Sequence, residues 1–266
     1  MMKFLERIKE VKEREVALLK QKTPGWKTDS LFTAGRKTLS LSESLRNHRE
    51  APVIAEYKRM SPSKGILNLN SPVSEVAEGY ESAGAAGISV LTENVFFGGS
   101  AGDLSVARNH TRLPILRKDF IIDEIQIYEA SGAGADAVLL IAALLGKKRL
   151  KELSLAAWTA GLEVVLEIHS EKELECINDH VSIIGVNNRD LNTLKVDINT
   201  SVKLAGRIPA GFMKIAESGI SSPGQIAMLM EAGYDGFLVG ERFMANPDPV
   251  KAFRLFIGEV KQNSGI

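Results

Sequence analysis

Charged side chains directly follow an apolar segment near residue 52, and their spacing suggests a chemical site. Pro52–Ala55 is apolar and typical of a buried strand, and Glu56 and Lys58 come after it. Because side chains alternate along a strand, these two point to the same side. Burying a charge costs several kcal/mol unless the charge is paired or used. A carboxylate and an ammonium on one face of a core strand therefore predict a polar site.

Polar groups follow most of the other apolar runs in the same way. They are Thr92 and Glu93 with the loop Phe96–Ser100, then Arg117, Lys118, Asp119 and Phe120, then Glu167 and His169, then Asn187, Asn188 and Arg189, then Glu217, Ser218 and Gly219, and last Gly240 and Glu241. One charged residue at a strand end is usually solvated. Several that meet at one edge can perturb one another's pKa values and predict an active site.

The apolar runs themselves predict the elements that position these groups. Eight runs recur roughly every 20–35 residues with helix-like segments between them, as expected for parallel strands joined by helical crossovers: 53–55, 88–91, 114–116, 137–141, 164–168, 183–186, 213–216 and 236–239. This arithmetic favours an α/β fold, a single (β/α)8 TIM barrel, with function at the carboxyl ends of the strands. An open doubly wound sheet is the alternative, but no Gly-x-Gly-x-x-Gly follows the first strand.

Residues 1–50 precede the first strand and have a different pattern. Residues 3–20 form an amphipathic helix, with apolar positions such as Phe4, Ile8 and Val16 among alternating charges, and a second helical segment runs from Leu39 to about Arg49. We therefore expect an extension, residues 1–50, packed on a barrel, residues 51–266.

Glycine, proline and serine residues predict where the helices of the barrel begin and end. Gly84, Gly134, Gly161 and Gly233 stand where a helix C-terminus favours glycine. Ser71-Pro72 predicts an N-cap serine before a proline at the first helical position. Ser222-Pro223-Gly224-Gln225 predicts a capping box.

The amino-acid composition indicates which kinds of partner and which cellular compartment to expect. The chain has 266 residues, is 44% hydrophobic, and has 33 basic and 33 acidic residues, so its zero net charge argues against nucleic acid or an anionic membrane as the main partner. The single cysteine, Cys176, excludes an internal disulfide and fits a reducing compartment. The N-terminus lacks a signal-peptide pattern and no apolar run approaches a membrane span. We expect a cytoplasmic monomer.

The last two strand ends favour a phosphate site. Ser218, Gly219, Gly240 and Glu241 are at positions where backbone N–H groups can approach an anion closely. In a barrel of this kind, phosphate is frequently bound at these two strands.

Longer motifs resemble one known family. Glu-Tyr-Lys-Arg-x-Ser-Pro-Ser (56–63), Leu-Thr-Glu (91–93) with Phe-x-Gly-Ser (97–100), Leu-Arg-Lys-Asp-Phe-Ile-Ile-Asp (116–123), Ile-Gly-Val-Asn-Asn-Arg-Asp-Leu (184–191), Ala-Glu-Ser-Gly-Ile (216–220) and Leu-Val-Gly-Glu (238–241) are similar to indole-3-glycerol phosphate synthase. The motifs occur in the family's order over essentially the whole chain.

The resemblance implies a reaction without metal or cofactor. The family converts 1-(2-carboxyphenylamino)-1-deoxyribulose 5-phosphate to indole-3-glycerol phosphate, carbon dioxide and water in tryptophan biosynthesis. It implies Lys118 as the acid that activates the C2′ carbonyl and Lys58 near the substrate carboxylate, with Glu167 and Lys58 as candidates for the base and the acid of dehydration. Which of Lys58 and Lys118 is the dehydration acid stays open.

The resemblance also assigns the remaining polar and apolar positions. Glu56 holds the lysines, Asn187 orients a catalytic carboxylate, and Glu217 contacts substrate hydroxyls. The substrate-binding positions are Ser61, Ser218, Gly219, Gly240 and Glu241 for phosphate, Arg189 for the polar network, and Phe97, Phe120 and Leu238 for the anthranilate ring. Met60 stands where some relatives have a lysine, so phosphate binding depends more on the backbone and Lys64.

Two rival functions and one structural question follow from the same residues. A phosphoribosylanthranilate isomerase would need a cysteine and an aspartate at the first and sixth strand ends, where this chain has Glu56-x-Lys58 and Asn187. A non-catalytic barrel that binds phosphate metabolites would tolerate loss of Lys118 and Glu167. In the family the N-terminal helix covers the carboxyl-end face of the barrel, as a lid that excludes water or as a stability cap.

Overall fold

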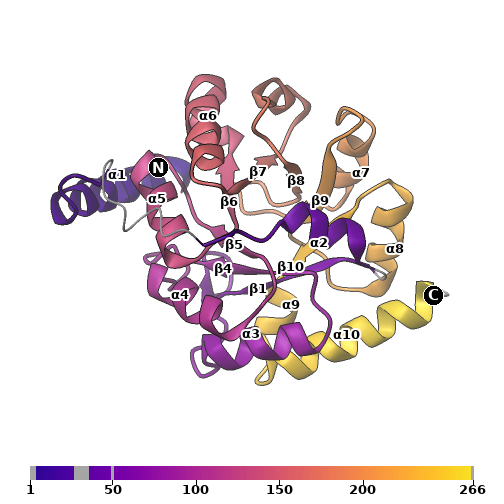
Figure 1. Cartoon of the computed structure of the whole chain (residues 1–266). Helices are drawn as coiled ribbons and strands as arrows, with labels where there is room; N and C mark the ends of the chain where they lie inside the picture. The colour runs from indigo at the N-terminus through magenta and orange to yellow at the C-terminus, as the bar shows by residue number, and fades with distance from the viewer. Residues whose placement is uncertain (1–3, 27–35, 49–50, 265–266) are drawn as a thin grey trace.

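Eight parallel strands close into a barrel in the computed structural model, which describes residues 4–26, 36–48 and 51–264 (Figure 1). The strands are β1 (Val53–Tyr57), β4 (Gly87–Leu91), β5 (Ile115–Lys118), β6 (Ala137–Ile141), β7 (Glu163–Ile168), β8 (Ile183–Asn187), β9 (Met213–Glu217) and β10 (Gly236–Val239). Each pairs with its sequence neighbour in this series, and β1 pairs with β10 to close the barrel. The TIM barrel expected from the apolar runs is confirmed.

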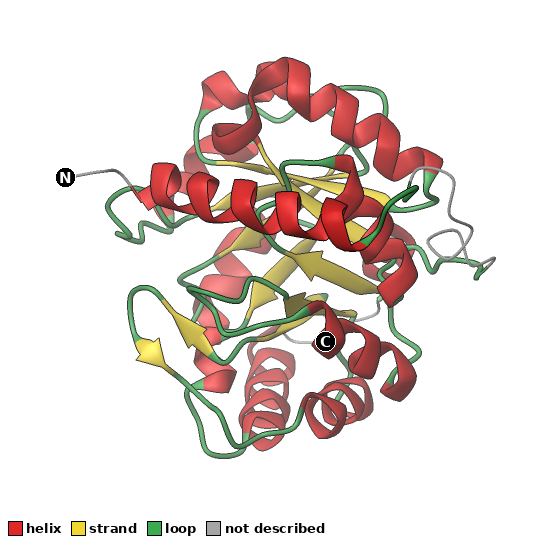
Figure 2. Ribbon diagram, turned by 90° about the vertical axis from the view of Figure 1, so that its left-hand side faces the viewer, coloured by secondary structure: helices red, strands yellow, loops and turns green. Residues whose placement is uncertain are grey.

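Helices surround the barrel on its outer face (Figures 1 and 2). They are α3 (Val73–Ser82), α4 (Ala101–His110), α5 (Glu124–Ala133), α6 (Ala142–Thr159), α7 (Asn199–Ala205), α8 (Pro223–Glu231), α9 (Glu241–Met244) and α10 (Pro249–Ser264). The connection from β7 to β8 has only a 3₁₀ helix, η2 (Glu171–Cys176), where we expected a longer helical segment. An antiparallel hairpin, β2 (Met60–Ser61) with β3 (Gly65–Ile66), follows β1 and was not expected.

Several strands are longer than their apolar runs. β1 continues through Glu56 to Tyr57, β5 reaches Lys118, β8 reaches Asn187 and β9 reaches Glu217. Four of the polar groups that we expected after the strands are thus strand residues themselves: Glu56, Lys118, Asn187 and Glu217. Because the barrel hydrogen bonds fix strand residues, their side chains have defined directions.

The two N-terminal helices pack at opposite ends of the barrel. α1 (Phe4–Lys22) packs at the carboxyl-end rim on the β4–β5 side, where Lys12 pairs with Asp119 and Lys20 with Asp123. α2 (Leu41–Asn47) covers the amino ends instead, because Leu41 packs at Gly87 and Leu45 at Gly236. The helix expected over the carboxyl-end face is therefore α1, and α2 closes the other end.

Most of the expected punctuation is confirmed. Gly84, Gly134, Gly161 and Gly233 all have positive φ, and Ser222 and Gln225 form the capping box of α8. The expectation for Ser71-Pro72 is wrong: α3 begins at Val73, and Pro72 is the N-cap without a side-chain hydrogen bond. Asn68 instead orders this turn, since its Oδ1 accepts the Ser71 N–H.

A helix that spans a bilayer must be both long and apolar. Within residues 4–26, 36–48 and 51–264, no helix meets both requirements.

Candidate active site

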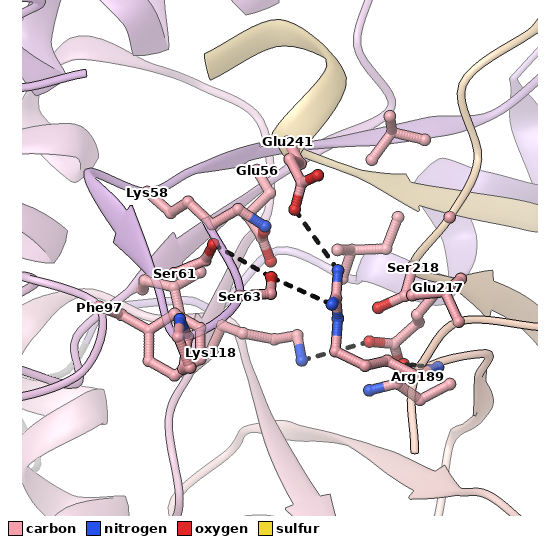
Figure 3. Close-up of a pocket in the computed structure, with 18 of the residues that line it drawn as sticks. Glu56, Lys58, Ser61, Ser63, Phe97, Lys118, Arg189, Glu217, Ser218 and Glu241 are labelled. Carbon is pink, nitrogen blue, oxygen red and sulfur yellow. Dashed lines mark hydrogen bonds and ion pairs between the residues drawn. The ribbon is translucent and has the colours of Figure 1, made fainter. Parts of the chain in front are cut away.

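A cavity of about 740 Å³ opens at the carboxyl ends of the strands. Figure 3 shows polar side chains from several strands and loops pointing toward one another across it. Every residue that the family resemblance assigned to catalysis or substrate binding lines this cavity: Glu56, Lys58, Ser61, Phe97, Lys118, Phe120, Glu167, Asn187, Arg189, Glu217, Ser218, Gly219, Leu238, Gly240 and Glu241. The strand ends bring together residues that are far apart in sequence.

Lys118 lies between two carboxylates from other strands. Its Nζ donates to Oε2 of Glu167 at 3.0 Å and is 3.3 Å from Oε2 of Glu217. Burial alone would lower the pKa of Lys118, but the charges of Glu167, Glu217 and Glu56 outweigh burial and raise it above its ordinary value. The side chain is 14% exposed, so a charged ammonium is presented to the cavity with little solvent around it.

A histidine supports Glu167 from the side opposite to Lys118. His169 Nε2 is 3.4 Å from Oε1 of Glu167, and His169 Nδ1 is 3.5 Å from Oε2 of Glu173. Burial lowers the pKa of His169, but the two glutamates outweigh burial and raise it to about 10. Burial raises the pKa of Glu167, but the nearby Lys118 and His169 outweigh burial, so the net shift is downward. Glu167 is therefore ionised at neutral pH.

The pKa of Glu217 is shifted upward, in contrast to that of Glu167. Burial raises its pKa, the charge of Lys118 opposes this, and the charges of Glu167 and Glu56 add to it, which gives a value of about 7. Among the described residues, Lys118 is the ion-pair partner of Glu217, at 3.3 Å from its Oε2. Room for this side chain depends on Gly185 on the adjacent strand, because a Cβ there would lie 2.2 Å from Oε1 of Glu217.

Glu56 in β1 and Lys58 directly after this strand form an ion pair. Nζ of Lys58 is 2.7 Å from Oε1 of Glu56, which confirms that the two side chains lie on the same side of the strand. Glu56 is buried against Gly240, where a Cβ would lie 2.5 Å from Oε1 of Glu56. Glycine at residue 240 therefore admits a carboxylate beside the last strand.

Arg189 links the loops at the other end of the cavity. Its guanidinium donates to Ser63 Oγ at 3.1 Å and pairs with Oε2 of Glu241 at 3.4 Å (Figure 3). Asn187 supports the backbone here, because its Oδ1 accepts the N–H of Arg189 at 2.9 Å. Ser218 has φ 66°, a left-handed value uncommon for a non-glycine residue, and it precedes Gly219 with φ 77°.

Apolar side chains from several segments of the chain also line the cavity. Phe97 and Phe120 lie with ring centroids 6.2 Å apart, and Leu238 contributes from the last strand. Sequence reasoning did not place Phe4, Leu139, Ile141 or Arg242 at the cavity, although all four line it. The alternation of side chains along a strand could have identified Leu139 and Ile141, whereas the sequence contains no signal for Phe4.

Some strand-end residues face away from the cavity. Arg117 is 4% exposed, pairs with Glu129 and Asp119, and does not line the cavity. Asn188 holds α7 through its hydrogen bonds to Ser201. Glu93 is fully buried and accepts backbone N–H groups of its own loop. These residues stabilise the loops that frame the cavity.

Both lysines that the resemblance assigns to catalysis are paired with carboxylates of the cavity. Lys118 pairs with Glu167, and Lys58 pairs with Glu56. Within the part of the chain that the structure describes, no group of three or more acidic, histidine or cysteine side chains could hold a metal ion.

Solved structures with this architecture include two tryptophan synthase alpha chains from Legionella pneumophila. One matches with a TM-score of 0.61 and 15% identity over 85% of this chain and 97% of that chain. The other matches with a TM-score of 0.59 and 14% identity over 84% and 94%. At this identity the likeness is one of fold.

Sequence relatives are much more similar. Indole-3-glycerol phosphate synthase from Bacteroides thetaiotaomicron is 46% identical over 212 residues, 80% of this chain and 82% of that protein. The proteins of the same name from Carboxydothermus hydrogenoformans and Bacillus cereus are each 44% identical over 96% and 98% of this chain, and 99% and 98% of theirs. The family model described as indole-3-glycerol phosphate synthase matches residues 5–256. The chain belongs to the indole-3-glycerol phosphate synthase family.

Proposed function

We propose that this chain closes the indole ring, converting 1-(2-carboxyphenylamino)-1-deoxyribulose 5-phosphate to indole-3-glycerol phosphate with release of carbon dioxide and water. The observation that carries the proposal is the placement of Lys118 between Glu167 and Glu217 at the cavity. The carbonyl at C2′ must gain a proton while the ring carbon attacks it. A buried, charged ammonium supplies that proton where few waters compete for it.

The remaining steps require groups on both sides of the substrate. Attack converts the carbonyl to a C2′ hydroxyl and makes the attacking ring carbon tetrahedral. Loss of carbon dioxide from that carbon returns the electrons of the broken bond to the benzene ring and restores its aromaticity. The hydroxyl then leaves as water while a proton is removed. Glu167 is ionised and suited to be the base, whereas Lys58 and Lys118 are both acids at the cavity. Lys58, held by Glu56, orients the substrate carboxylate.

The substrate's two ends have separate recognition groups. Ser61, Ser218, Gly219, Gly240 and the backbone of Glu241 bind the phosphate, with Lys64 nearby on the hairpin. Arg189 joins this region to the hairpin through Ser63. Phe97, Phe120 and Leu238 contact the aromatic ring, and Glu217 contacts the substrate hydroxyls. Asn187 orders the turn that carries Arg189.

The rival isomerase reading finds no support at the cavity. Cys176 is the one cysteine in the sequence, and it lies in η2 and does not line the cavity. We further propose that the protein acts in the cytoplasm as a monomer, in keeping with a sequence whose single cysteine fits a reducing compartment. Size-exclusion chromatography with light scattering tests the monomer.

The direct test of function is product formation. Purified protein incubated with the carboxyphenylamino-deoxyribulose phosphate gives a rise in indole fluorescence and one equivalent of carbon dioxide per substrate. Absence of both with the wild-type protein overturns the proposal. Turnover of phosphoribosylanthranilate instead supports the isomerase, and tight binding without turnover supports the non-catalytic barrel.

A further inference from the structure

The buried face of α1 contains a lysine. Ile8, Lys12 and Val16 are one turn apart on one side of the helix, and all three are buried. Lys12 is 1% exposed, whereas a lysine is almost never fully buried unless it is paired. Burial lowers its pKa, but Asp119 and Glu15 outweigh burial and the net shift is upward, so the side chain is charged. A buried ammonium therefore enters the barrel rim from the N-terminal helix.

The partner of Lys12 is the residue that follows Lys118. Nζ of Lys12 is 2.7 Å from Oδ1 of Asp119, which is also buried and lines the cavity. The same Oδ1 accepts the backbone N–H of Phe120 at 2.8 Å. The other oxygen of Asp119 accepts from Thr92 at 2.5 Å and from Arg117 at 3.1 Å. Asp119 thus joins α1 to the loop that carries Phe120.

A second buried carboxylate lies within the electrostatic reach of Lys12. Glu93 is fully buried, and its carboxylate accepts the backbone N–H groups of Phe96 at 2.6 Å and Phe97 at 3.0 Å. Burial raises the pKa of Glu93, while the Phe96 N–H and the charge of Lys12 oppose this. Lys12 therefore favours the charged form of the carboxylate that orders the Phe97 loop.

Both carboxylates position aromatic side chains of the cavity. Asp119 binds the backbone of Phe120, Glu93 binds that of Phe97, and the two rings lie 6.2 Å apart at the cavity. Arg117 is the other buried cation here, and Glu129 shares it. Without Lys12, the buried negative charge would exceed the positive charge, and an uncompensated buried charge is strongly destabilising for the loops that hold it.

We propose that Lys12 of α1 is a positioning residue for substrate binding. Its ammonium holds Asp119 and the loop of Glu93 in place. Phe120 and Phe97, which these two carboxylates position, then contact the substrate's aromatic ring. The inference rests on the proposed function, because that function supplies the ring. It assigns the N-terminal helix a specific task in the site, through Asp119 and Glu93, in addition to covering the rim.

Two ligands distinguish a positioning role of Lys12 from a general effect on the stability of the protein. Indole-3-glycerol phosphate has the ring and the phosphate, whereas glycerol 3-phosphate has only the phosphate end. Lys12→Met keeps the length of the apolar stem and removes the charge. By calorimetry, we expect it to weaken indole-3-glycerol phosphate about tenfold and to leave glycerol 3-phosphate within about twofold of wild type. The matched control is Lys9→Met, an exposed lysine of the same helix, with no change for either ligand.

A structural role would produce a different pattern. Melting curves fix a temperature at which every variant is folded, and binding is measured there. Equal weakening of both ligands, or no weakening of the ring-containing one, overturns the proposal. Lys12→Arg keeps the charge and restores affinity for indole-3-glycerol phosphate to within about threefold of wild type; a loss as large as that of Lys12→Met shows that the charge is not responsible.

A double variant tests the route through Asp119. If Lys12 acts through that carboxylate, Lys12→Met with Asp119→Asn loses no more affinity than the weaker-binding single variant. Losses that multiply contradict the proposal. Failure of the proposed function has its own signature, since the wild-type protein would then bind glycerol 3-phosphate but neither bind nor form indole-3-glycerol phosphate.

Discussion

Lys118 donates a hydrogen bond to Glu167 at 3.0 Å from a strand two positions away in the barrel, with Glu217 at 3.3 Å from the same ammonium. The two glutamates respond differently to this one lysine. Burial raises the pKa of both glutamates, but Lys118 and His169 together bring that of Glu167 below its ordinary value, whereas the pKa of Glu217 stays raised. The site therefore contains a base and a protonatable acid within reach of one cation, which suits a reaction with separate proton donation and removal.

The shifted Glu217 predicts how stability depends on pH. Its pKa rises from 4.5 in the unfolded chain to about 7 in the folded protein, so between these values the folded state binds more protons. The free energy of unfolding therefore falls as pH rises through this window, by on the order of 3 kcal/mol from this group. In urea unfolding from about pH 5 to about pH 8, Glu217→Gln flattens this fall, while the exposed control Glu231→Gln retains it. An unchanged slope in Glu217→Gln contradicts the assignment.

His169 predicts the acid limb of the pH–rate profile. Its charge lowers the pKa of Glu167, so His169→Asn raises that pKa and shifts the acid limb of kcat/KM upward by about one pH unit. The measurement is a kcat/KM profile of wild type and variant. His180→Asn is the control, because His180 stacks on Trp158 at the surface and does not line the cavity. Coincident profiles for wild type and His169→Asn would show that Glu167 is not the group that titrates.

Arg189 predicts a loss of binding at the phosphate end. Its contacts to Ser63 and Glu241 hold the hairpin and the last strand loop together. Arg189→Ala raises KM about tenfold or more with a smaller change in kcat, because the lost interactions form in both ground and transition states. Inhibition by inorganic phosphate weakens in parallel. Arg207→Ala, an exposed arginine paired with Glu171 at 3.8 Å, serves as the control. A change confined to kcat in Arg189→Ala runs against this assignment.

Gly185 predicts a steric effect on Glu217. A Cβ at residue 185 would lie 2.2 Å from Oε1 of Glu217, and the side chain must move to relieve the overlap. Gly185→Ala therefore lowers kcat by at least about tenfold and lowers the melting temperature, since the glutamate is buried and well packed. Gly224→Ala is the control, because a Cβ there would meet no atom within 4 Å apart from its chain neighbours and the backbone of its own helix. Wild-type kcat in Gly185→Ala would show that the position of Glu217 is not critical.

The barrel and the cavity lining could be predicted because both follow from local rules. Runs of β-branched residues, with glycines between them, indicated the strand positions, and alternation placed Glu56 and Lys58 on the same side of the first strand. A closed parallel barrel then brings all strand ends to one edge, so the predicted residues meet at one cavity.

The rest depended on contacts between distant segments. The pattern of α1 contained no sign that Lys12 is buried against Asp119. The β2–β3 hairpin and η2 are too short for periodicity to identify. The capping of α3 differed because Asn68, outside the local motif, bonds the turn.

The role of Lys118 is tested by the turnover of Lys118→Met, with product binding measured alongside. Both wild type and variant are titrated with indole-3-glycerol phosphate, and kcat is then measured with saturating carboxyphenylamino-deoxyribulose phosphate by indole fluorescence. We predict that kcat falls by about 10³-fold or more while product affinity stays within about tenfold of wild type. A kcat within about threefold of wild type at full saturation would contradict the role of Lys118 as the acid that starts ring closure.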